Sequence, residues 1–194
     1  MGRFAAMSQQ QSPASDIDGA IDEVAAAVHS VDGPTLNAVA ADIAAAKVIA
    51  TYAGGREGLV MKGLTMRLFH AGLDAHSVGE MTCPAVGEGD LLILSCGPGN
   101  ISTVEALAGV ATEAGARVLL FTAEPGQPPA QLADRVVVIS AQTMASDGGS
   151  AAVLPMGSGY EIALFVLVDL ITNRVRALRQ ESAEVMRARH TNLE

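Results

Sequence analysis

Short apolar segments alternate with segments of helical spacing from residue 47 onward. Five apolar segments have the length and composition of buried strands, and they cover residues 48–53, 75–79, 90–96, 117–123 and 135–140. Helix patterns separate and follow them, over residues 59–71, 102–114, 130–133 and 157–178, with a last helix from residue 181. This alternation predicts an α/β fold, a three-layer α-β-α sandwich around a five-stranded parallel sheet with right-handed crossovers.

Two further helices are predicted ahead of the first strand, over residues 15–30 and 34–46. The first places Ile17, Ile21 and Val24 on one face. Because the sheet does not need both helices, we expect them to cover a sheet edge or to pack against another subunit. Residues 1–13 contain a Gln-rich stretch and are predicted to be a disordered tail, which leaves residues 14–194 as a single domain.

The segment after the predicted third strand indicates a ligand site. Residues 97–100, with the sequence Gly-Pro-Gly-Asn, fit neither a helix nor a strand. Ser102 and Glu105 have the spacing of a capping box, so a helix is expected to begin at Ser102. In a parallel sheet, ligands bind where such a turn joins the carboxyl end of a central strand to a helix N-terminus. A plain connecting turn explains the same residues equally well.

Composition narrows the classes of function. The 194 residues carry a formal charge of −9 and no basic cluster long enough to follow a nucleic-acid backbone, so we expect no nucleic-acid partner. Cys83 and Cys96 lack a CxxC spacing and are interpreted as reduced thiols, and the chain has no 18-residue apolar run and no leader. These features predict a cytoplasmic protein with no membrane partner. No histidine pair has metal-ligand spacing, so no metal is expected.

Six short motifs occur in a characteristic order along the chain. They are Gly55-Arg56 with Gly58, residues 66–72 (MRLFHAG), Gly79-Glu80, Gly97-x-Gly99, residues 155–158 (PMGS) with Glu161, and residues 189–194 (RHTNLE). In this order and spacing they resemble the sugar isomerase (SIS) domain family, and within it the 6-phospho-3-hexuloisomerase group. The resemblance covers nearly all of the chain after the tail and implies the flavodoxin-like SIS fold.

The resemblance implies a cofactor-free isomerase that acts on a sugar or a sugar phosphate and moves a proton between adjacent carbons through a cis-enediol. In the family, a carboxylate matching Glu161 is the base. A histidine matching His190 helps to open the sugar ring and is often presented to a neighbouring subunit. An arginine matching Arg56 stabilises charge on the substrate. The family usually forms tetramers, so a homo-oligomer is implied, either a dimer or a tetramer.

The same motifs imply a wider set of substrate contacts. The residues expected to bind the substrate are Gly55, Arg56, Glu80, Gly97, Gly99, Asn100, Ser102 and Thr103.

Each candidate also has a simpler explanation. Ser158 and Glu161 have the spacing of a capping box, which by itself accounts for a glutamate at residue 161. His190 lies close to the end of the chain, where most histidines are solvated, and Arg56 lies in a glycine turn. The family motifs favour a functional role over the simpler explanation for Glu161 and for Arg56. The sequence around His190 also supports a functional role for that residue.

The chain departs from the family where a phosphate is expected to bind. The family's hydroxyl-rich loop is replaced by residues 96–102, in which Pro98 and Ile101 remove hydrogen-bond donors. Glu57 stands where the family has a serine, which places an anion beside the expected anion. The sequence therefore leaves two hypotheses: an isomerase of an altered or unphosphorylated sugar, or a non-catalytic sugar-binding module with a sensing role.

Overall fold

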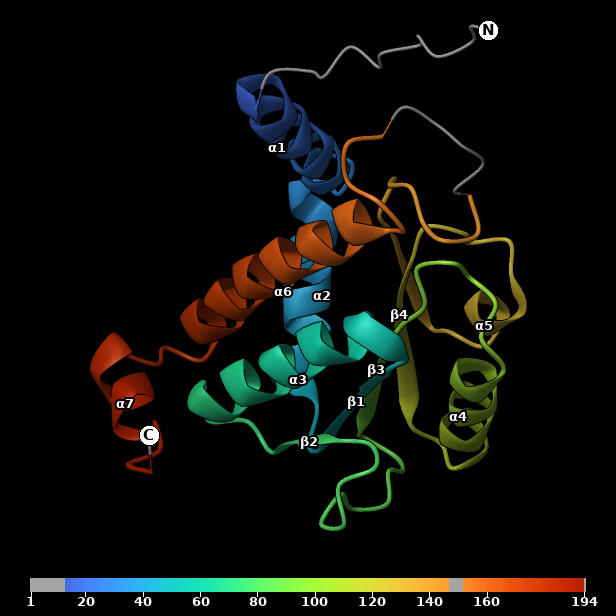
Figure 1. The fold of residues 1–194 in the computed structure, drawn as a ribbon. Coiled ribbons are helices and arrows are strands. Elements are labelled where there is room, and N and C mark those ends of the chain that lie inside the picture. Colours follow the sequence, from blue (N-terminus) through green and yellow to red (C-terminus); the bar gives the residue numbers. More distant parts are fainter. Residues whose placement is uncertain (1–12, 147–151, 194) are drawn as a thin grey trace, which may run out of the picture.

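The computed structural model describes residues 13–146 and 152–193 of the chain. Its centre is a five-stranded sheet with the order β2-β1-β3-β4-β5, and every neighbouring pair of strands is parallel (Figure 1). The strands are β1 (Ile49–Ala53), β2 (Ala75–Ser77), β3 (Leu91–Ser95), β4 (Arg117–Thr122) and β5 (Arg135–Val138). The predicted α/β class and the parallel sheet are confirmed.

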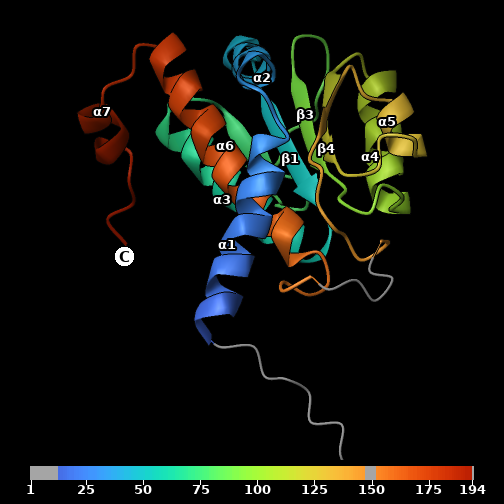
Figure 2. The same cartoon turned by 90° about the horizontal axis from the view of Figure 1, so that it is seen from above.

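Helices cover both faces of the sheet (Figure 2). One face carries α1 (Pro13–His29), α2 (Gly33–Ala45), α3 (Gly55–His70) and α6 (Ser158–Leu178), and the other carries α4 (Ser102–Glu113) and α5 (Pro128–Gln131). A last helix, α7 (Ala183–Ala188), lies beside the C-terminal end of α3, where Arg179 and Arg189 donate hydrogen bonds to the carbonyls of Gly72 and His70. Among the described residues, no helix has the length and hydropathy needed to cross a bilayer.

The central strand β3 is buried on both faces, as its continuous apolar run predicts. Ile93 packs into the core under α1, α2, α3 and α6, whereas Leu92 and Leu94 pack into the core under α4. All five residues of the strand are buried. This is the pattern of a parallel strand covered by helices on both sides, and it fixes the position of the turn that follows Ser95.

The start of α3 differs from the sequence-based expectation. The helix expected from residue 59 begins four residues earlier, because Gly54 is the N-cap and α3 begins at Gly55. Arg56 and Glu57 therefore lie in the first turn of a helix rather than in a loop. This places both side chains at the carboxyl end of β1.

The start of α4 also differs, because the capping box expected from Ser102 to Glu105 does not form. Ile101 is the N-cap, and no side chain caps the helix. Ile101 instead packs against the core under α4. Ile101 is partly buried there, so its packing favours an N-cap one residue before the expected cap.

Two predicted loops lie wholly or partly outside the described residues. The expected disordered tail, residues 1–13, is outside them except for Pro13, at which α1 begins. The polar segment after Ser140, which is expected to form a loop, is described only up to residue 146.

The strand order creates a switch point between β1 and β3. The chain leaves β1 to form β2 on one side and returns to form β3 on the other side. In open parallel sheets, ligands bind at the carboxyl edge of such a point, because the two crossovers diverge there and leave a crevice. The turn at Gly54 and the turn over residues 97–100 flank this crevice, so the fold itself locates the candidate site.

We predict that the turn after β3 requires glycine at residue 99. Gly99 has a φ of 83°, and an added Cβ would lie 2.7 Å from Cγ of Gln127 and 3.0 Å from the carbonyl oxygen of Glu124. Gly99→Ala should therefore lower the free energy of unfolding by about 2 kcal/mol or more in urea denaturation. Gly109→Ala is the matched control, because a Cβ meets nothing within 4 Å there and alanine favours a helix by about 0.5–1 kcal/mol. Equal stability of the two variants would contradict this reasoning.

Candidate active site

A cavity of about 340 Å³ lies at the switch point. Its walls come from the first turn of α3, the turn after β3 with the N-cap of α4, and the first turn of α6. The lining residues are Gly54, Gly55, Arg56, Glu57, Gly97, Pro98, Ile101, Thr143, Met144, Met156, Gly157, Tyr160 and Glu161. The N-terminal ends of three helices thus meet at one cavity, and their dipoles and unpaired N–H groups favour negative charge there.

Glu161 faces Arg56 across this cavity. Nε of Arg56 lies 3.1 Å from Oε2 of Glu161, and Nη1 of Arg56 donates a 3.1 Å hydrogen bond to the hydroxyl of Ser158. The first contact is an ion pair rather than an aligned hydrogen bond, because that buried oxygen accepts no hydrogen bond. Only 14% of the Glu161 side chain is exposed. Burial raises the pKa of the Glu161 carboxyl, and the positive charge of Arg56 opposes the increase.

The capping-box explanation of Glu161 is wrong. Gly157 is the N-cap of α6, with a φ of 81°, and no side chain caps the helix. Ser158 is therefore already the first helical residue, and its hydroxyl accepts from Arg56 instead of from the backbone. Glu161 is left free to point into the cavity, as a base would need to do.

A second carboxyl group, that of Glu57, forms the floor of the cavity. Both of its oxygens accept from the N–H of Gly97, at 3.1 and 3.0 Å, and Oε2 also accepts from the hydroxyl of Ser95 at 2.5 Å. Burial raises the pKa of Glu57, the bonds from Ser95 and Gly97 lower it, and the nearby charge of Glu161 raises it further.

Ser95 links this floor to α6. Its hydroxyl lies 3.1 Å from the hydroxyl of Tyr160, whose ring is almost completely buried, and burial raises the pKa of that phenol well above its usual value. Gly97 must lack a side chain, because an added Cβ would lie 2.9 Å from the Tyr160 ring and 3.0 Å from Glu57. Sequence reasoning did not find Ser95 and Tyr160. The available signals were a serine at the end of the central strand and a tyrosine next to the candidate base.

The cavity contains some of the substrate-binding residues expected from the sequence and not others. Gly55, Arg56 and Gly97 line it. Gly99 is buried in the same turn but is not part of the lining, and Glu80 lies exposed in the turn after β2. Three more are exposed at the start of α4 and do not line the cavity: Asn100, Ser102 and Thr103.

His190 lies at the opposite end of α3 from Glu161. Its ring stacks on the ring of His70, with the ring centroids 5.2 Å apart. Arg56 and His70 are separated by about 21 Å along α3, at about 1.5 Å per residue. One chain therefore does not bring the two expected catalytic residues together.

Comparison with known proteins identifies the family. The chain is 37% identical over 173 residues to a 3-hexulose-6-phosphate isomerase from Mycobacterium gastri. The aligned residues cover 89% of this chain and 87% of the relative. The chain belongs to the 3-hexulose-6-phosphate isomerase family. No protein-family model matches it.

Solved structures agree with this family at the level of the fold. A protein from Methanococcus jannaschii, whose structure led to the inference of a 3-hexulose-6-phosphate isomerase function, matches with a TM-score of 0.80 and 24% identity, over 93% of this chain and 99% of that one. The NanR protein of Vibrio vulnificus, complexed with ManNAc-6P, matches with a TM-score of 0.71 and 20% identity, over 95% of this chain and 72% of that one.

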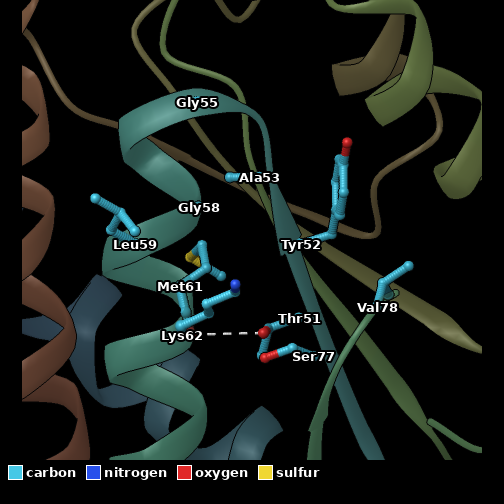
Figure 3. A pocket seen from close by; sticks show the side chains of 10 residues that line it. All are labelled: Thr51, Tyr52, Ala53, Gly55, Gly58, Leu59, Met61, Lys62, Ser77 and Val78. Carbon is cyan, nitrogen blue, oxygen red and sulfur yellow. Dashed lines mark hydrogen bonds between the residues drawn. The ribbon is translucent and has the colours of Figure 1, made fainter. Parts of the chain in front are cut away.

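Another cavity, of about 240 Å³, lies between α3 and strands β1 and β2 (Figure 3). Lys62 is the one charged residue in the lining of this cavity. In the figure, the side chains of Thr51 and Ser77 point toward Lys62. Both hydroxyls are hydrogen bonded to Thr65. The residues that line this cavity include no carboxyl group, whereas the lining of the cavity at the switch point contains Glu57 and Glu161. Within the described ranges, no group of three or more His, Cys, Asp or Glu residues is placed to hold a metal ion.

We predict that Glu57 makes stability depend on pH. Because the folded protein raises the pKa of Glu57 above its ordinary value of 4.5, protonation of this group favours folding. Its contribution to stability is complete below pH 4.5 and is lost as the pH rises through the folded-state pKa. Compared with Glu57→Gln, the wild-type protein should therefore lose free energy of unfolding as the pH rises above 4.5, as measured by urea denaturation. Glu113→Gln, an exposed site at the end of α4, serves as the control. A difference that is constant with pH would contradict the prediction.

Proposed function

We propose that the protein is an isomerase that moves the carbonyl group between adjacent carbons of a hexulose or its phosphate. The observation that carries the proposal is Glu161, a largely shielded carboxyl held beside Arg56 in a cavity at the switch point of a fold shared with sugar-phosphate isomerases. Membership of the 3-hexulose-6-phosphate isomerase family supports the reaction type.

The proposed chemistry requires one base that acts twice. The Glu161 carboxylate removes the proton from the carbon next to the carbonyl, and the electron pair forms a cis-enediolate. Glu161 then returns the proton to the former carbonyl carbon, and the hydroxyl proton of the neighbouring carbon moves to the former carbonyl oxygen, which leaves the carbonyl one position further along the chain. Burial raises the pKa of Glu161 toward the range where it can both accept and return a proton, while Arg56 keeps the ionised form accessible. The guanidinium of Arg56 also provides positive charge where the enediolate oxygen develops its negative charge.

We propose that His190 acts in the cavity of a neighbouring subunit of a homo-oligomer. Two observations support this role: His190 lies far from Glu161 within one chain, and exposed apolar side chains continue from the cavity along α3 and α6. This apolar stripe consists of Leu59, Met66, Phe69, Ile162, Phe165, Val166 and Leu170. Arg67 and Asp169, 3.5 Å apart and both about half exposed, lie on the same two helices. That pair gives Asp169 a partner on the helices that carry the apolar stripe, which supports an interface between subunits there.

The proposal includes a cytoplasmic location and the absence of a nucleic-acid partner and of a cofactor. The two free cysteines support the cytoplasmic location. The net charge of −9 supports the absence of a nucleic-acid partner.

The alternative is a sugar-binding module that senses its ligand without turning it over. It is favoured by Glu57, which occupies hydrogen-bond donors that a ligand anion would need. NanR shows that this fold also occurs in a protein with a bound sugar phosphate.

Glu161→Gln should abolish isomerisation while preserving the fold. Removing a general base typically lowers the rate by about 10²–10⁴-fold. The measurement is NMR of hexulose and hexulose 6-phosphate in D2O, which follows both turnover and deuterium uptake at the adjacent carbon. Glu113→Gln should retain wild-type rates. If Glu161→Gln retained wild-type exchange, the proposed base would be wrong, and absence of turnover in the wild type would favour the sensing module.

A mixture of Glu161→Gln and His190→Gln subunits should regain activity that neither variant has alone. If His190 acts across an interface, a mixed pair contains one site with both residues intact. Random reassociation of a dimer after unfolding and refolding should then restore about a quarter of wild-type activity. If both residues acted within one chain, the mixture would be as inactive as its components.

A further inference from the structure

The carboxylate of Glu57 is an anion already held at the floor of the cavity. Its donors are the N–H of Gly97 and the hydroxyl of Ser95, and we call these two donors with Glu57 the cradle. β3 ends at Ser95, and Gly97 follows it after Cys96. The N-terminus of α4 adds positive potential at this turn. A backbone N–H, a hydroxyl and a helix N-terminus are the groups that bind a phosphate, and here a side chain of the same chain occupies them.

The charges around the cradle disfavour a second anion. The charged residues of the cavity lining are Glu57, Glu161 and Arg56. Nε of Arg56 is 3.1 Å from Glu161, and its Nη1 is bonded to Ser158, so its charge is already balanced within the cavity. A phosphate dianion at Gly97 would lie next to the Glu57 carboxylate with no further cation in the lining to offset the repulsion. Pro98, the next residue of the turn, has no N–H to contribute.

The same carboxylate is suited to an uncharged partner. A carboxylate has about four acceptor positions, and Gly97 and Ser95 do not use all of them. Because Glu57 lines the cavity, a sugar hydroxyl that enters the cradle can donate to it. Polar groups that must be hydrogen bonded when buried discriminate strongly between a ligand that offers a donor and one that offers only acceptors.

We infer that Glu57 is a specificity-determining residue that makes the cavity select an unphosphorylated sugar, whose hydroxyl donates to the cradle, over the corresponding sugar phosphate. The inference rests on the proposed function only in assuming that this cavity binds a sugar. It narrows the substrate class to a polyhydroxy ketone that presents an uncharged hydroxyl, and not a phosphate, to the cradle.

The test compares ligands that differ only in the phosphate. Wild type, Glu57→Gln and Glu57→Ser are titrated calorimetrically with inorganic phosphate, D-fructose and D-fructose 6-phosphate. Both variants should bind inorganic phosphate and D-fructose 6-phosphate about tenfold or more tightly than the wild type does. The wild type should bind D-fructose more tightly than its phosphate, and Glu113→Gln should bind as the wild type does. Thermal unfolding reports whether each variant is folded, and the near-isosteric Glu57→Gln decides the result if Glu57→Ser is not.

The inference is overturned if Glu57→Gln binds inorganic phosphate no more tightly than the wild type, or if the wild type prefers D-fructose 6-phosphate. Either result would mean that a phosphate displaces Glu57 or binds elsewhere in the cavity. These titrations do not depend on turnover, so they separate the inference from the proposed function. An inactive protein that shows the expected affinities keeps the inference and loses the isomerase, whereas an active protein without them does the reverse.

Discussion

The structure of the site depends on the meeting of three helix N-termini at one edge of the sheet. Each terminus favours a nearby negative charge by about 0.3–1 kcal/mol, and up to about 2 kcal/mol when partly buried. Burying an ionised carboxyl costs several kcal/mol. The termini and hydrogen bonds therefore compensate only part of the cost, and the pKa values of Glu57 and Glu161 are both raised. This partial compensation leaves two carboxyl groups in one cavity that both hold a proton more readily than an exposed glutamate does.

The first turn of α6 couples the floor and the wall of the cavity. Tyr160 and Glu161 are consecutive, and successive side chains on a helix point about 100° apart. Tyr160 accordingly packs inward, 3.1 Å from the hydroxyl of Ser95, while Glu161 faces Arg56. Since Ser95 also bonds to Glu57, a small shift of α6 would change the surroundings of both carboxyl groups together. The packing of α6 against α1, α2 and α3 restrains such a shift.

Local sequence pattern predicted the architecture, because each strand is a short apolar run between helices and β3 is buried on both faces. It also indicated the cavity, since the glycine turn over residues 97–100 follows the central strand and precedes a helix N-terminus. It failed where tertiary contacts compete with local preferences. Ile101 takes the place of the expected cap at Ser102, and its partly buried side chain packs against the core under α4. Glu57 was expected only to repel an anion, whereas Ser95 and Gly97 bind its carboxylate. A hydrogen bond across 38 residues leaves no periodic signal in the chain.

The position of α7 keeps His190 away from Glu161 of its own chain, so the role proposed for His190 requires a second chain. Arg189 binds Glu181 and the carbonyl of His70, so the C-terminal segment is fixed to the end of α3 that lies farthest from the cavity. The apolar stripe runs along α3 and α6 between those two ends. In an isologous pair, each patch contacts its own copy in the reverse direction. An antiparallel pairing of the two stripes would therefore bring the His190 end of each chain toward the Arg56 end of the other, which a chain on its own cannot do.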